Sequence, residues 1–171
     1  MKSLAIGLIL LMIVTTGTYN EVNADPFHRG INYEQLTKHQ RAQVDCLAMN
    51  VYREAGYESV SGQLAVAIVT MNRVQSGKFK NTVCRVVHQS RDGLCQFSWT
   101  CVKSGQVKVN PNVYNYTREL STKVFINRSL IHDYMSGALF FHAKDVKPNW
   151  KNVKVVTRVG QHVFYKPIGA S

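Results

Sequence analysis

The fold of this chain is decided by the stretch VDCLAMNVYREAG at residues 44–56. Its apolar residues recur at the i, i+3, i+4 and i+7 spacing of a helix that buries one face. Thr37 with Gln40 resembles a capping box at the start of this helix, and Gly56 is a typical residue to end it. The pattern predicts a long amphipathic helix that carries Glu54 in its last turn.

The next segments predict further helices. Residues 64–74 are apolar nearly all round, which is typical of a helix at the centre of a core, and Ser59 or Ser61 can cap it. A short helix is expected at residues 81–89 and a longer one at residues 112–128.

Strands are expected mainly near the end of the chain. Residues 94–101 alternate like a strand or hairpin arm, and residues 137–142 form a short apolar strand or loop. Residues 153–166 alternate on both sides of Gly160 and Gln161, which predicts a terminal β-hairpin. Helices followed by a small antiparallel sheet give an α+β fold class that is predominantly helical.

Residues 1–24 have the features of a signal peptide. Lys2 supplies a positive charge, and residues 4–14 are an apolar run shorter than the roughly 20 residues of a membrane span. Small side chains precede a plausible cleavage point after Ala24. The alternative is an uncleaved N-terminal anchor, and both interpretations place the folded part outside the cytoplasm, in the periplasm or the extracellular space.

The rest of the chain predicts one domain. Its 171 residues, 45% of them hydrophobic and 18% charged, are enough for a single globular core. Residues 25–36 are polar and aperiodic and are interpreted as a leader segment, and residues 37–171 as a single domain.

The chain is strongly basic, with 21 Lys and Arg against 10 Asp and Glu and a net charge of +11. A basic surface implies an anionic partner, which outside the cytoplasm is a cell-envelope polymer or lipid head group rather than nucleic acid. The alternative is that the charge only aids solubility, because the basic residues are scattered and form no run of five.

The four cysteines are Cys46, Cys84, Cys95 and Cys101. In an oxidising compartment this even count predicts up to two disulfides, with three possible connectivities. A bridge between Cys95 and Cys101 would close a tight loop. Cys46 and Cys84 would then either pair across a helix contact or remain buried thiols.

Glu54 is the acidic residue with the most unusual position. A carboxylate is disfavoured at the negative C-terminal end of a helix, and Tyr52 and Tyr57 flank this one. Partial burial in that field predicts a raised pKa, which is what a general acid needs near neutral pH. The alternative is an exposed terminal glutamate that pairs with Arg53 or with solvent.

Several blocks of sequence occur in a recognisable order across roughly residues 44–166. They are LAMNVYREAGYE at 47–58, GQLAVA at 62–67 with NRV at 72–74, CQFSWT at 95–100, ALFFHA at 138–143 and VGQHVFY at 159–165. Together they resemble the SleB/CwlJ-type cell-wall hydrolases, and the block CQFSWT at 95–100 resembles one found in the Gram-negative and phage branch of that family.

The resemblance implies a lysozyme-like fold and cleavage between N-acetylmuramic acid and N-acetylglucosamine. It places the family's catalytic acid at Glu54 and makes residues 37–171 a catalytic domain. The family usually reads Glu-Ala-Arg-Gly-Glu here, whereas this chain reads EAGYE at 54–58. The arginine is missing, although the two carboxylates keep their spacing.

Two mechanisms fit this assignment. A hydrolytic muramidase needs a second carboxyl group across the scissile bond, for which Glu58 is a candidate. A lytic transglycosylase needs only one: the acid protonates the glycosidic oxygen, and the muramoyl 6-hydroxyl closes a 1,6-anhydro ring. Because other acids near Glu54 are few, the single-acid route is favoured.

Five residues are candidates for substrate binding. Gln96 and Ser98 could bind sugar N-acetyl and hydroxyl groups, Trp99 could stack on a sugar ring, and His142 and Glu58 could bind substrate or stabilise charge. In a strand, alternate side chains point to opposite faces, so Gln96 and Ser98 could face the cleft only if Trp99 faced away from it. Trp99 would otherwise be a core residue, and His142 structural.

Other function classes are weaker. A zinc amidase would need histidines at ligand spacing, and the six histidines form no HExxH or comparable pair. A cysteine peptidase would need a reactive thiol, whereas Cys46 lies on the inner helical stripe. A basic wall-binding module without activity fits the charge equally well. No metal or organic cofactor is expected, and the chain is expected to be a monomer.

Overall fold

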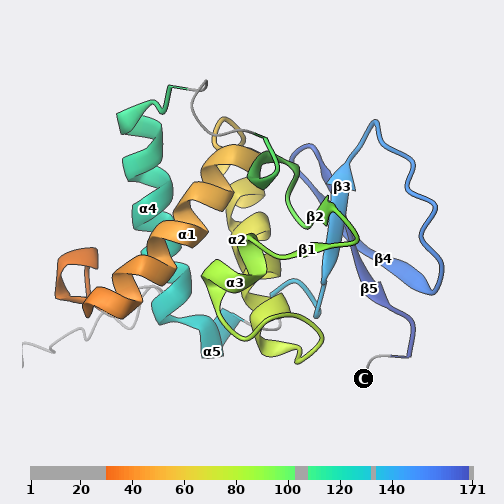
Figure 1. The fold of residues 1–171 in the computed structure, drawn as a ribbon, viewed down its shortest axis with the longest axis horizontal. Helices are drawn as coiled ribbons and strands as arrows, with labels where there is room; N and C mark the ends of the chain where they lie inside the picture. The colour runs from red at the N-terminus through yellow and green to blue at the C-terminus, as the bar shows by residue number, and fades with distance from the viewer. Residues whose placement is uncertain (1–29, 103–107, 132–133, 170–171) are drawn as a thin grey trace, which may run out of the picture.

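The computed structural model describes residues 30–102, 108–131 and 134–169, and a long helix, α1 (Lys38–Ala55), runs through its centre (Figure 1). The predicted capping box is present, since the Thr37 side chain accepts from the Gln40 amide and the Gln40 side chain accepts from the Thr37 amide. Glu54 therefore lies in the last turn of α1, as predicted.

The expected signal peptide and residues 25–29 lie outside the described residues. The rest of the proposed leader joins the folded domain: η1 (Tyr33–Gln35) is a 3-10 helix, and Leu36 is buried in the core. The Tyr33 hydroxyl donates to the Asp45 carboxylate, which fastens this segment to α1.

The helix α2 (Val60–Gln75) lies at the centre of the core and begins at Ser59, one of the two predicted caps. It is buried nearly all round, as its sequence predicts. The shorter helix α3 (Val83–Val87) and the long helix α4 (Pro111–Ile126) pack with α2 against α1. A single turn, α5 (Arg128–Ile131), follows α4. None of the helices in the described ranges is both long and apolar enough to cross a membrane.

The larger sheet has three antiparallel strands in the order β3-β5-β4 and lies to one side of the helices (Figure 1). The strands are β3 (Phe140–Ala143), β4 (Val153–Val159) and β5 (His162–Pro167). The last two form the predicted hairpin, with a register shift between Val155 and Thr157. Phe141, Phe164 and Val159 face the helices and complete the core.

The predicted strand over residues 94–101 is wrong in its second half. The strand β2 (Leu94–Cys95) pairs with β1 (Ser90–Arg91), and the chain then turns into the 3-10 helix η2 (Ser98–Thr100). The disulfide is the reason, because it holds the Cα atoms of Cys95 and Cys101 5.9 Å apart. Six residues of extended strand would span about 20 Å.

The two disulfides are Cys46–Cys84 and Cys95–Cys101. This is the connectivity in which a tight loop closes on itself and the other pair bridges two helices. Cys46 lies on α1 and Cys84 on α3, so their bond joins α1 to the short helix that leads into the first hairpin.

Replacing Cys46 and Cys84 together by alanine should destabilise the domain. The bond joins residues 38 positions apart, and a loop of that length restricts the unfolded chain by up to about 4 kcal/mol. We expect urea unfolding to show a loss of roughly 2–4 kcal/mol. The matched control is Cys95→Ala/Cys101→Ala. The disulfide that it removes closes a loop of only 6 residues, so the loss of stability should be smaller. Equal losses would contradict the loop-length argument.

Candidate functional site

Glu54 lies at the edge of a cavity of about 360 Å3 that opens beside the end of α1. The next residues keep the chain tight here: Gly56 adopts a helical conformation so close to the preceding turn that a Cβ atom would strike the Tyr52 carbonyl. The other side chains that line the cavity are aromatic or charged: Tyr52, Arg53, Tyr57, Glu58 and Lys108.

Burial raises the pKa of the Glu54 carboxyl from 4.5 to about 7, and the positive charge of Arg73 opposes this rise. A carboxyl group with this pKa is protonated in about half of the molecules at neutral pH. It can therefore give a proton to a leaving oxygen and take one back within the same cycle. The raised pKa expected from the sequence is present, with desolvation as its main cause.

Arg73 is a candidate functional residue that the sequence pattern did not single out. It lies on α2, only 3% exposed, and its Nε donates to the Leu139 carbonyl at 2.7 Å. Its guanidinium carbon lies 4.9 Å from the ring centre of Phe97, with Phe79 and Phe141 also near. Its Nη1 is buried without a hydrogen-bond partner among the described groups.

Burial lowers the pKa of Arg73 to about 10, and the charge of Glu54 opposes the fall. Because this value is still well above neutral, the guanidinium stays positive in the working range. A basic residue within an otherwise apolar helix was the signal available in the sequence, since such a residue needs a compensating partner. The partner lies on the neighbouring helix α1.

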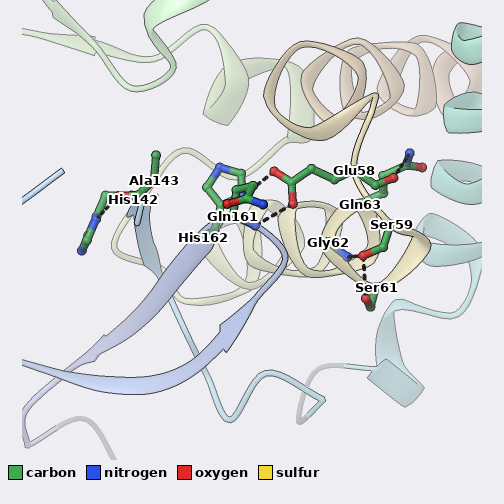
Figure 2. A network of polar contacts seen from close by, with 9 residues as sticks. All are labelled: Glu58, Ser59, Ser61, Gly62, Gln63, His142, Ala143, Gln161 and His162. Carbon is green, nitrogen blue, oxygen red and sulfur yellow. Dashed lines mark hydrogen bonds and ion pairs between the residues drawn. The ribbon is translucent and has the colours of Figure 1, made fainter. Parts of the chain in front are cut away.

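Glu58 lines the same cavity but points its carboxylate at the β4–β5 turn (Figure 2). One oxygen accepts from the Gln161 amide at 3.0 Å, and the other lies 3.1 Å from His162 Nδ1 without forming a hydrogen bond. Burial lowers the pKa of His162 although Glu58 opposes this, so the imidazole is mainly neutral at pH 7. The carboxylate thus joins the hairpin to the start of α2.

The residues Gln96, Ser98 and Trp99 do not line the cavity beside Glu54. Trp99 donates from Nε1 to Asn50 Oδ1 at 3.0 Å and packs edge-on against His88, so it closes one side of the core. Ser98 is exposed and Gln96 half-buried. The expected alternation of the segment is absent, because residues 98–100 are helical rather than extended.

His142 has its ring nitrogens within hydrogen-bonding distance of the Ala143 carbonyl and the Tyr165 hydroxyl, at 2.7 and 2.8 Å. Its ring also packs against Trp150 and Tyr165. Along β3 it alternates with Phe141, which faces the core, and Figure 2 shows it beyond the strand from Glu58. The structure therefore does not bring it together with Glu54.

The sequence matches that of a known protein family. A sequence model described as cell wall hydrolase matches residues 57–165, which are 109 of the 171 residues. The chain belongs to the cell wall hydrolase family. Glu54 lies three residues before the matched range, within the helix that leads into it.

Curated relatives of this chain include the spore cortex-lytic enzyme of Bacillus cereus. That protein is 29% identical over 153 residues, which are 88% of this chain and 53% of the relative. The enzyme of the same name from Bacillus subtilis is 29% identical over 121 residues, 69% of this chain and 35% of the relative. The chain thus spans about half, or less, of the length of the curated relatives it matches.

Two solved structures share the fold. The catalytic domain of the Bacillus cereus SleB protein matches with a TM-score of 0.53 and 30% identity, over 72% of this chain and 89% of that one. The catalytic domain of the germination-specific lytic transglycosylase SleB from Bacillus anthracis gives 0.52 and 31%, over 72% and 93%. These matches confirm the SleB/CwlJ-type family and the α+β, mainly helical, lysozyme-like fold class.

Metal ligands of the usual kind are not grouped in the part of the chain that the structure describes: within residues 30–102, 108–131 and 134–169, no three His, Cys, Asp or Glu side chains lie close enough to hold an ion. The chemistry available at the cavity includes that of the half-buried Glu54 carboxyl group, a nearby buried cation and the exposed phenol group of Tyr57.

Replacing Gly160 by alanine should loosen the hairpin from α2. Gly160 has a φ of 56°, and a Cβ atom there would overlap Glu58 Oε2. Gly77→Ala is the matched control, because its φ is 67° but the space around it is open. Both changes should lower the free energy of unfolding by about 1–2 kcal/mol, because alanine is strained at a positive φ. Gly160→Ala should lower it further through the overlap with Glu58, and urea unfolding measures both losses. Equal losses of stability would show that the Glu58 side chain moves aside at no cost.

Proposed function

We propose that this chain is an exported peptidoglycan-cleaving enzyme that uses Glu54 as its acid. The bond cut would be that between N-acetylmuramic acid and N-acetylglucosamine. The observation that carries the proposal is the half-buried Glu54 carboxyl group beside a cavity, with a pKa of about 7. The matches to spore cortex-lytic enzymes and to SleB catalytic domains support the substrate class.

In the proposed reaction the protonated Glu54 donates its proton to the glycosidic oxygen, and the bond to the muramoyl anomeric carbon breaks. The muramoyl 6-hydroxyl attacks that carbon, and the Glu54 carboxylate takes the hydroxyl proton. The products are a 1,6-anhydromuramoyl end and a free N-acetylglucosamine end, and Glu54 is again protonated. No water is consumed, so the atoms balance without a further reactant.

Arg73 would act between the two proton transfers. When Glu54 has given up its proton, its carboxylate lies in a partly buried site, which is costly unless a positive charge is near. The Arg73 guanidinium supplies that charge without having to move, because the Leu139 carbonyl and three phenyl rings hold it in position. It is a positioning residue for the charge on Glu54.

A lytic transglycosylase fits the cavity better than a hydrolytic muramidase. The only other carboxylate among the described residues that line the cavity is Glu58, and it is bound to Gln161 and beside His162. A second catalytic carboxylate would have to leave those contacts to reach a water molecule or a sugar. The relative described as a lytic transglycosylase supports the same choice.

The setting outside the cytoplasm is part of the proposal, with cleavage of a signal peptide after Ala24. The two disulfides agree with an oxidising compartment. The net charge of +11 would favour approach to anionic cell-envelope polymers.

Mass spectrometry of the fragments released from purified sacculi tests the proposal. A transglycosylase releases anhydromuropeptides, which are lighter by one water than the products of a hydrolase. Products that end in a reducing N-acetylmuramic acid would point to the muramidase alternative. A basic wall-binding module would bind the sacculi, weaken with added salt and release no fragments.

A further inference from the structure

The cavity beside Glu54 has a cationic side that the proposed reaction does not use. Arg53 and Lys108 both line it, and they come from segments far apart in the sequence. Among the ion pairs of the described residues, none involves either side chain. Arg53 Nε is buried and has no hydrogen-bond partner among the described residues. The two cations are thus available to a ligand.

The acidic groups of the cavity do not neutralise these cations. Glu58 is turned to the hairpin, and Glu54 is only partly ionised near pH 7. Lys108 is held in the region by a contact two residues away, where the Asn110 amide donates to the Tyr52 hydroxyl at 3.0 Å. Asn110 also caps α4, so its position is fixed by both its backbone amide and its side chain.

An exposed aromatic ring completes this side of the cavity. Tyr57 is 78% exposed, and its ring centre lies 6.4 Å from that of the buried Tyr52. An exposed tyrosine beside a cavity offers an apolar face and a hydroxyl group to a sugar ring or peptide at little entropic cost. The cavity volume of about 360 Å3 is at the lower end of the range for small-ligand sites.

Resting on the proposed function, we propose that Arg53 and Lys108 bind a carboxylate of the peptide stem carried by the N-acetylmuramic acid beside the scissile bond. While the stem is attached, the lactyl carboxyl of the glycan is part of a neutral amide, so the free carboxylates near the scissile bond are those of the stem. Arg53 can bind a carboxylate with two parallel hydrogen bonds, and Lys108 adds a point charge. The enzyme would therefore prefer peptide-bearing strands to bare ones.

The test compares cleavage of two soluble substrates of equal length: glycan strands with their stems, and the same strands after an amidase has removed the stems and the freed lactyl carboxylates have been converted to neutral methyl amides. The wild-type protein should cleave the stem-bearing strands with a kcat/KM at least about tenfold higher, since one charge-assisted hydrogen bond contributes that much. The difference should lie mainly in KM and shrink with added salt.

The variant Arg53→Gln/Lys108→Gln should lower this preference to near unity. Arg85→Gln/Lys80→Gln is the matched control, because it removes the same charges from exposed sites outside the cavity, and it should keep the wild-type preference. Lys108→Gln alone, at an exposed position, should reduce the preference partly and gives a second readout if the double variant unfolds.

Equal cleavage of both substrates by the wild-type protein would overturn the inference and leave the proposed function standing. An equal fall of both rates in the double variant would also overturn it, because the charges would then serve general attraction to the wall. If the wild-type protein cleaves neither substrate, the proposed function fails and this inference falls with it.

Discussion

Glu54→Gln is expected to lower kcat/KM on purified sacculi by about a thousandfold or more. The amide keeps the size and hydrogen-bonding capacity of the side chain but has no proton to give to the glycosidic oxygen. Because Glu54 would act first as acid and then as base, one substitution removes both proton transfers. Release of anhydromuropeptides, followed by chromatography, measures the loss.

The same variant should be at least as stable as the wild-type protein. Burial raises the folded-state pKa of Glu54 from 4.5 to about 7, so the folded chain holds this proton more tightly than the unfolded chain. Folding is therefore progressively penalised as the pH rises from about 4.5 to about 7, and fully above that. Glutamine removes the penalty, so thermal unfolding should match the wild-type protein at pH 4 and occur at a higher temperature at pH 8.

Glu58→Gln is the matched control for this prediction, because it makes the same chemical change four residues along the chain in the same cavity. It should lower stability through the Gln161 and His162 contacts and reduce the rate much less than Glu54→Gln. Equal losses of rate from the two variants would favour the two-carboxylate muramidase. Full activity of Glu54→Gln would end the enzymatic proposal.

Local patterns in the sequence predict much of this fold. The Thr37 capping box, the apolar centre of α2 and the hairpin around Gly160 each depend on residues within a few positions of one another. Such signals act through backbone geometry and burial, which neighbouring residues largely decide. The place of Glu54 at the end of a helix follows from the same kind of evidence.

The site was harder to predict, because its contacts join residues far apart in the chain. Trp99 is turned to Asn50 by the Cys95–Cys101 loop, and strand alternation could not reveal that. The pairing of Glu58 with the hairpin spans 103 residues. Arg73 resembles any basic residue in the sequence until its Leu139 contact, 66 residues away, and its phenyl neighbours are seen.

Arg73→Met should change both the rate of the reaction and its dependence on pH. Methionine has a similar volume and can fill the space among Phe79, Phe97 and Phe141, but it removes the charge beside Glu54. Because Arg73 holds the pKa of Glu54 down, its loss should raise that pKa further. The Glu54 carboxylate formed during the reaction would lose the buried positive charge of Arg73, and kcat should fall about 10- to 100-fold.

The direction of the pH shift separates this role from packing alone. The active form has Glu54 protonated, so kcat/KM falls as the pH rises through the pKa of Glu54. In Arg73→Met the falling limb should move to higher pH, whereas in Arg73→Lys, which keeps a positive charge, it should stay nearer the wild-type position. Both variants leave the Leu139 carbonyl with a changed partner, so both should lose stability, and profiles must be measured well below their unfolding temperatures. The falling limb of the pH profile could instead stay in place in Arg73→Met, with activity lost only in proportion to unfolding. Arg73 would then be a packing residue that does not stabilise the charge on Glu54.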